Sequence, residues 1–130
     1  MIVVDASALL ELLLRTPSAA AIEARLFDLD ETLHVPHAVD VEIAQVLRRI
    51  VAAKQMDAQH CRVILDRWLD VPVKRYPHNV LLPRIWELRQ NLSAYDAVYV
   101  ALAEALDIPL VTHDARLANA PGHTAKIELI

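Results

Sequence analysis

Short apolar segments alternate with longer segments of helical periodicity along nearly all of this 130-residue chain. The short segments are typical of buried strands, and the longer ones repeat apolar residues every three or four positions, as helices do. We predict strands over residues 2–4, 33–35, 71–76, 109–112 and 126–129. Because strands that alternate with helices pair in parallel through right-handed crossovers, the pattern predicts an α/β fold.

Helical segments separate the predicted strands. We predict helices over residues 8–15, 17–27, 38–53, 80–90 and 94–106, and one more that Asp57 caps. Thr16 and Pro17 have the residue types of an N-cap and a first helical position, so we expect them to start the second helix. These elements predict a three-layer α/β/α sandwich in a single domain over residues 1–130. Its sheet would hold about five parallel strands, and an order such as 3-2-1-4-5 would make the first and fourth strands neighbours.

The composition restricts the core and excludes some binding motifs. Hydrophobic residues make up 55% of the chain and aromatic residues 5%, so Ala, Val, Leu and Ile must fill most of the core. Cys61 is the single cysteine, and its helical spacing with Trp68 and Leu69 predicts one buried face. Trp86 also has core spacing. Gly122 is the single glycine, which excludes a glycine-rich phosphate loop.

The formal net charge is −4, from 17 acidic and 13 basic residues. Such a charge does not attract nucleic acid over the whole surface, so local arginines or metal ions would have to hold an anionic substrate. The N-terminus has no basic segment typical of a signal peptide, and no apolar run approaches the roughly 18 residues of a membrane span. We therefore expect a cytoplasmic protein without a membrane segment.

Four acidic residues fall at one end of the predicted sheet. Asp5 follows the first strand directly, and Asp114 lies two residues beyond the fourth. Glu42 lies in the first turns of the helix that leaves the second strand. Asp96 lies in the first turn of the helix that enters the fourth strand, and that helix runs antiparallel to its strand. The topology therefore brings all four carboxylates to the carboxyl ends of the strands, where ligands bind in open α/β sheets.

Each acid also has a purely structural explanation. Asp5 and Asp114 could cap helices, and Asp96 is spaced from Ser93 as in a capping box. Glu42 could interact with a helix dipole. These explanations do not account for all four acids sharing one rim. Crowded carboxylates repel one another unless cations offset their charge, and Mg²⁺ prefers oxygen ligands. The pattern predicts metal-assisted hydrolysis of a phosphate ester.

With these residues in view, the chain resembles the PIN-domain ribonucleases, and most closely the VapC-like toxins of bacterial toxin–antitoxin pairs. The matching stretches are MIVVDASALLELLL, HVPHAVDVEIAQVLRRI, LSAYDAVYVALAEALDIPLVTHDARLA and KIELI. The third stretch is the most specific, because its Tyr-Asp-Ala, its Ala-rich helix and its Leu-Val-Thr-x-Asp-x-Arg-Leu follow in the family's order and spacing.

The resemblance implies particular roles for particular residues. It places Asp5, Glu42, Asp96 and Asp114 on the family's acidic metal-binding and catalytic quartet. It places Ser7 and Thr112 on hydroxyl positions that support this quartet. The implied activity is endonucleolytic cleavage of RNA with Mg²⁺ or Mn²⁺. The implied partners are a second copy of the chain, in a homodimer, and an antitoxin whose C-terminal segment lies over the catalytic groove.

Some residues and alternatives stay open on sequence alone. Arg15 and Arg116 lie near rim elements in the sequence and are candidates to contact RNA phosphates. His113 could touch substrate or simply be exposed beside the site. A receiver-like phosphoacceptor domain also places acids and a Thr at strand ends, but the stretch after the third strand is Pro-His-Asn, with no acceptor Asp. A non-catalytic interaction module with the same architecture is the other alternative.

Overall fold

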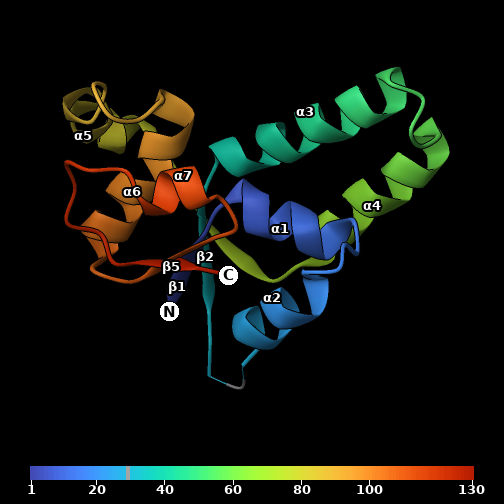
Figure 1. Ribbon diagram of the computed structural model, residues 1–130, viewed down its shortest axis with the longest axis horizontal. Helices are drawn as coiled ribbons and strands as arrows, with labels where there is room; N and C mark the ends of the chain where they lie inside the picture. Colours follow the sequence, from blue (N-terminus) through green and yellow to red (C-terminus); the bar gives the residue numbers. More distant parts are fainter. Residues whose placement is uncertain (29) are drawn as a thin grey trace.

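The structure, a computed structural model, describes residues 1–28 and 30–130. Within them, five parallel strands form one sheet in the order β3-β2-β1-β4-β5 (Figure 1). The strands are β1 (Ile2–Val4), β2 (Leu33–Pro36), β3 (Val73–Tyr76), β4 (Leu110–Thr112) and β5 (Ile127–Leu129). The predicted α/β class and strand order are confirmed.

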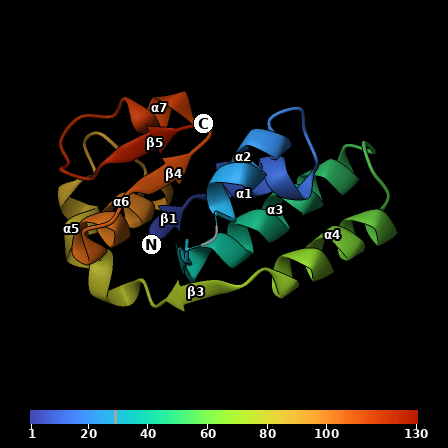
Figure 2. The ribbon, with the colours of Figure 1, turned by 90° about the horizontal axis from the view of Figure 1, so that it is seen from below.

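Helices cover both faces of the sheet. They are α1 (Ala6–Leu13), α2 (Ala19–Leu26), α3 (Ala38–Ala52), α4 (Ala58–Asp70), α5 (Leu82–Glu87), α6 (Ala94–Leu106) and α7 (Ala115–Ala118), with a 3₁₀ turn η1 (Asn79–Leu81) before α5. Helices α1 to α4 pack with one another on one side, and α5 and α6 pack together on the other (Figure 2). No helix of the described residues is long and apolar enough to cross a membrane.

Helix α6 occupies the centre of its layer. It contacts β1, β2 and β4, and all of its residues 97–103 are buried. A helix that is apolar all round is typical of a fully covered position. The alanines at 97, 101 and 103 are among these buried residues. The position of α6 matters for the site because its first turn carries Asp96.

The predicted start of the second helix is wrong. Ser18 is the N-cap residue of α2, and the Thr16–Pro17 pair lies before it. The Thr16 backbone N–H donates to the Glu11 carbonyl at 3.1 Å, and the Thr16 hydroxyl donates to the Glu11 carboxylate. Thr16 therefore terminates α1 instead of starting α2, because Glu11 lies within reach of both its donors.

The predicted burial of the aromatic residues is half right. Trp68 is 1% exposed and Cys61 is buried beside it in α4, as predicted. Leu69 and Trp86 are exposed, which corrects the prediction for both. Trp86 follows the buried Ile85 in α5, and this short helix buries a single face. The Trp86 ring instead packs under the guanidinium of Arg89, 4.8 Å from the ring centroid.

Candidate active site

The four predicted acids lie at the N-terminal ends of four helices along one rim of the sheet. Asp5 is the N-cap of α1 and Asp114 the N-cap of α7. Glu42 is the fifth residue of α3, and Asp96 lies in the first turn of α6. In Figure 1, α1 and α3 begin close together at the upper ends of β1 and β2. The helix N-termini supply partial positive charge to this acidic rim.

Asp5 is held rigidly by donors from two elements. Its Oδ1 accepts from Ser7 Oγ at 2.7 Å and from the Ala8 backbone N–H at 3.1 Å. Its Oδ2 accepts from Thr112 Oγ1 at 2.8 Å, and that oxygen accepts in turn from the Asp114 N–H at 3.0 Å. Thr112, at the end of β4, therefore fixes the relative positions of two carboxylates that are 109 residues apart in the chain.

Burial raises the pKa of Asp5, although the hydrogen bonds from Ser7, Ala8 and Thr112 oppose this effect. The negative charge of Asp114 raises the pKa of Asp5 further. The Asp5 carboxyl is 5% exposed, so little water offsets its charge. A buried carboxylate next to another carboxylate is a position where a cation is strongly favoured.

Glu42 is the most perturbed acid of the rim. Burial raises its pKa to about 7, and the charges of Asp5 and Asp96 act in the same direction. Tyr99 opposes this by donating its hydroxyl to Glu42 Oε1 at 2.9 Å. The mutual influence of Glu42, Asp5 and Asp96 means that α1, α3 and α6 bring their carboxylates into one electrostatic site.

Arg116 lies between the two remaining carboxylates. Its Nη2 donates to Asp96 Oδ2 and to Asp114 Oδ2, each at 3.1 Å. Asp114 Oδ1 also accepts the backbone N–H groups of Arg116 at 2.8 Å and Leu117 at 3.4 Å. Burial alone would raise the pKa of Asp114, but the hydrogen bonds and charge of Arg116 outweigh it and lower the pKa.

The donor atoms of the rim fit a hard divalent cation, since all are carboxylate oxygens. No three acidic, histidine or cysteine side chains of the described residues already surround a common point. Arg116 accounts for part of this, because its guanidinium occupies oxygens of both Asp96 and Asp114. The ligand type and charge of the rim therefore match Mg²⁺ or Mn²⁺. Two of its carboxylates, those of Asp96 and Asp114, are paired with the guanidinium of Arg116.

Of the other site residues predicted from the sequence, some contact the acidic rim and some lie away from it. Ser7 and Thr112 contact Asp5 directly, as described above. Arg15 follows the last turn of α1, at the opposite end of that helix from Asp5. The half-buried His113 ring hydrogen-bonds the Ile130 carbonyl, and its backbone N–H donates to Ser7 Oγ at 3.0 Å. Its backbone therefore supports the rim, while its ring contacts Ile130, the residue that follows β5.

Tyr99 is a rim residue that the sequence analysis missed. It is 2% exposed and holds Glu42 through the hydrogen bond given above. A signal for it existed, because Tyr99 follows Asp96 by three residues on α6 and side chains at this spacing share a helix face. Its burial inside an apolar helix made it resemble an ordinary core residue.

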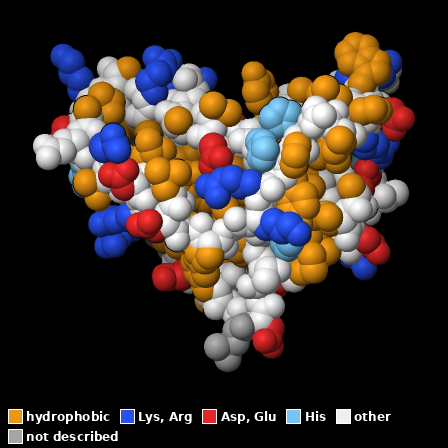
Figure 3. Space-filling view, turned by 180° about the vertical axis from the view of Figure 1, so that it is seen from behind, with side chains coloured by type: hydrophobic (Ala, Val, Ile, Leu, Met, Phe, Trp, Pro, Cys, Tyr) orange, Lys and Arg blue, Asp and Glu red, His pale blue; other side chains and the backbone are white. Residues whose placement is uncertain are grey.

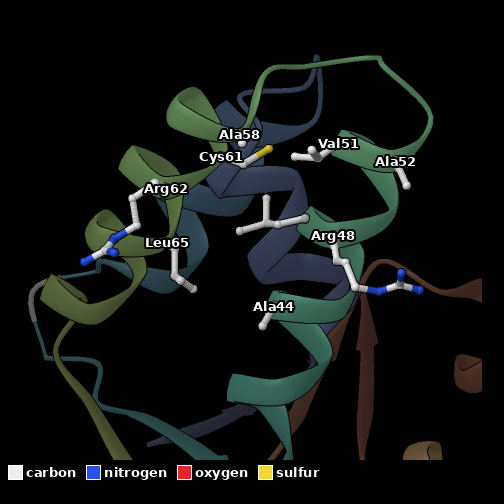
Figure 4. Close-up of a pocket in the computed structure, with 9 residues that line it drawn as sticks. Ala44, Arg48, Val51, Ala52, Ala58, Cys61, Arg62 and Leu65 are labelled. Carbon is white, nitrogen blue, oxygen red and sulfur yellow. The ribbon is translucent and has the colours of Figure 1, made fainter.

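A groove between α3 and α4 is separate from the acidic rim. It holds about 450 Å³ between α3 and α4. Figure 4 shows the side chains of Val51 and Cys61 directed into the groove, while Arg48 and Arg62 extend away on either side. Its lining contains no carboxylate, so the chemistry predicted for the acids does not belong there.

The pKa of Glu42 predicts an unusual pH dependence of stability in protein freed of metal. Its folded-state pKa of about 7 lies above the ordinary 4.5, so the folded state binds the proton more tightly. Stability is therefore lost as pH rises from about 4.5 through 7. The loss is at most about 3 kcal/mol. We expect the Glu42→Gln variant to lose less unfolding free energy than wild type between pH 5 and pH 8, measured by urea denaturation in EDTA.

Glu23→Gln is the matched control, because Glu23 lies on the exposed face of α2. We expect this variant to follow the wild-type pH profile. Equal losses of unfolding free energy in wild type and Glu42→Gln would show that Glu42 does not cause the pH dependence.

Comparison with known proteins agrees with the fold and shows the family. Residues 2–122 match the PIN domain family. Ribonuclease VapC12 of Mycobacterium tuberculosis is 42% identical over 130 residues, covering 100% of this chain and 99% of that protein. Ribonuclease VapC9 of the same strain is 52% identical over 119 residues, covering 92% and 90%. The chain therefore belongs to the PIN domain family, among the VapC ribonucleases.

A solved structure shares the architecture at low sequence identity. VapBC2 from Rickettsia felis, determined bound to a DNA fragment from its promoter, matches with a TM-score of 0.73 and 16% identity. The match covers 99% of this chain and 98% of that one. The fold is thus retained over the whole length although few residues are shared.

Proposed function

We propose that the acidic rim is the catalytic centre of a divalent-metal-dependent endoribonuclease that acts as the toxin of a VapBC-type pair. The observation that carries this proposal is the meeting of Asp5, Glu42, Asp96 and Asp114 on one rim from four separate helices. Two relatives that are named ribonucleases and match 92% and 100% of this chain support it.

Asp5, Asp96 and Asp114 are the proposed holders of Mg²⁺ or Mn²⁺, with Glu42 beside them. When bound, such a cation supplies positive charge against the phosphodiester and acidifies a water molecule. Ser7 and Thr112 fix the orientation of Asp5, so this carboxylate needs little rearrangement.

Glu42 is the proposed proton acceptor of the rim. Burial raises the pKa of Glu42 to about 7, so this carboxyl holds a proton near neutral pH more readily than an ordinary glutamate. Tyr99 occupies Oε1, which leaves Oε2 as the oxygen to receive that proton.

The two alternatives raised by the sequence are less well supported. A receiver-like domain needs an acceptor Asp closing its third strand, but β3 ends at Tyr76 and is followed by Pro77. A non-catalytic module would have no need to keep four carboxylates in mutual repulsion, because such crowding costs stability.

The proposed partners are RNA, an antitoxin and a second copy of the chain. Membership of the VapC ribonucleases implies the antitoxin, and a cytoplasmic location follows from an RNA substrate.

A candidate surface for the second copy lies around α5, where apolar side chains reach the surface at the upper right of Figure 3. Its exposed large side chains are Val80, Leu82, Trp86 and Tyr95. Exposed Trp and Tyr are enriched at protein interfaces.

An RNA cleavage assay tests the proposal. Purified protein is incubated with total RNA in Mg²⁺ or Mn²⁺, with and without excess EDTA, and the new 5′ ends are mapped. We expect discrete cleavage that requires the divalent cation. Discrete cleavage that persists unchanged in EDTA would contradict the mechanism, and mapped ends would give the site of cleavage.

A further inference from the structure

Arg116 is the one cation among the described residues whose side chain is hydrogen-bonded to two acids of the rim. A single nitrogen, Nη2, contacts both Asp96 and Asp114, and the side chain is 75% exposed. It comes from the first turn of α7, two residues after the N-cap Asp114. The site is therefore partly neutralised by the chain itself.

This contact competes with any divalent cation for the same carboxylates. A cation bound to Asp96 and Asp114 would place two positive charges next to the guanidinium, and like charges repel. Release of Arg116 is cheap, since exposed ion pairs contribute little stability. The backbone N–H of Arg116 donates to Asp114 Oδ1 at 2.8 Å, so the side chain can leave while α7 keeps its cap.

Once released from the two carboxylates, the Arg116 guanidinium can bind a phosphate of the RNA substrate. Guanidinium groups bind phosphate oxygens through two parallel hydrogen bonds, and RNA brings phosphates to this rim in the proposed reaction. Arg15 offers no substitute, because it lies at the far end of α1 from the rim.

We propose that Arg116 has two positions: it bridges Asp96 and Asp114 in the metal-free protein, and a divalent cation displaces it to contact an RNA phosphate. This inference rests on the proposed metal dependence. Arg116 then holds Asp96 and Asp114 together in the absence of metal and links metal binding to substrate binding. Without RNA, the guanidinium lowers the affinity of the site for metal.

Side-chain NMR tests the displacement directly. Protein labelled with ¹⁵N-arginine is observed in EDTA and in saturating Mg²⁺, and Arg116→Gln assigns the Arg116 signal. We expect the Arg116 guanidinium to shift and become more mobile with Mg²⁺. Arg25, which pairs with Glu31 at 2.7 Å near the amino end of β1, should not change. An Arg116 signal that stays unchanged at saturating Mg²⁺ would overturn the inference while leaving the metal site intact.

Calorimetric titration with Mg²⁺ tests the competition. We expect Arg116→Gln to bind Mg²⁺ roughly two- to tenfold more tightly than wild type, the range expected for removing one or two exposed ion pairs. Arg62→Gln, on α4 and paired with Asp66, changes the net charge equally and should leave the affinity unchanged. Equal tightening in both variants, or none in Arg116→Gln, would overturn the inference. Failure of wild type to bind Mg²⁺ at all would overturn the proposed function as well.

Discussion

Replacing Asp96 with Asn is expected to lower the rate of RNA cleavage by about a thousandfold. The amide keeps the size of the side chain but removes a negative charge that would hold the divalent cation, and such charge stabilisation contributes several kcal/mol to a transition state. The fold should survive, because the side chain of Ser93, and not that of Asp96, caps α6. Cleavage rates in Mg²⁺ and melting temperatures in EDTA would be measured on the same samples.

Asp107→Asn is the matched control on the same helix. Asp107 ends α6 at the opposite side of the molecule from the rim, in the left-handed conformation at φ 53°. Asn tolerates this conformation, so we expect the substitution to change the cleavage rate and the melting temperature very little. An Asp96→Asn protein that retained more than about a tenth of the wild-type rate would leave Asp96 outside the catalytic centre.

Replacing Trp68 with Ala is expected to cost about 3–5 kcal/mol of unfolding free energy. Trp68 is 1% exposed, and its Nε1 donates to Asp40 Oδ1 at 2.7 Å. The guanidinium of Arg75 lies 5.2 Å from the Trp68 ring centroid and pairs with the same Asp40. Truncation therefore leaves a cavity and removes a donor from a carboxylate that joins α3, α4 and β3. Chemical denaturation gives the difference directly.

Trp86→Ala provides the contrast within the same residue type. Because Trp86 is exposed and contacts Arg89, its truncation should change the unfolding free energy of the monomer by no more than about 1 kcal/mol. Similar losses for both tryptophans would contradict the assignment of one to the core and the other to the surface.

The fold and the position of the acids could be predicted because they depend on two features of the sequence. These are the spacing of apolar residues and the order of strands and helices along the chain. Alternating strands and helices require parallel crossovers, and the strand order 3-2-1-4-5 brings the ends of β1 and β4 together. Asp5 and Asp114 follow those two strands, so their approach is a consequence of topology. The lengths of individual elements were predicted less well, as Thr16 shows.

The details of the rim depend on three-dimensional contacts that have no local signature. The pairing of Arg116 with Asp96 joins residues 20 positions apart, and that of Tyr99 with Glu42 joins residues 57 apart. The exposure of Trp86 was missed for a related reason. Periodicity identifies an apolar face of a helix, but the packing of neighbouring elements decides which apolar residues that face buries.

The central claim is that carboxylates from distant parts of the chain share one divalent cation. Its most direct test is a crystal structure of the protein grown with Mn²⁺, with the ion located by its anomalous scattering. We predict one manganese peak at the rim, bound by at least two of the carboxylates of Asp5, Asp96 and Asp114. A well-ordered crystal that holds Mn²⁺ elsewhere, with this rim free of it, would contradict the account.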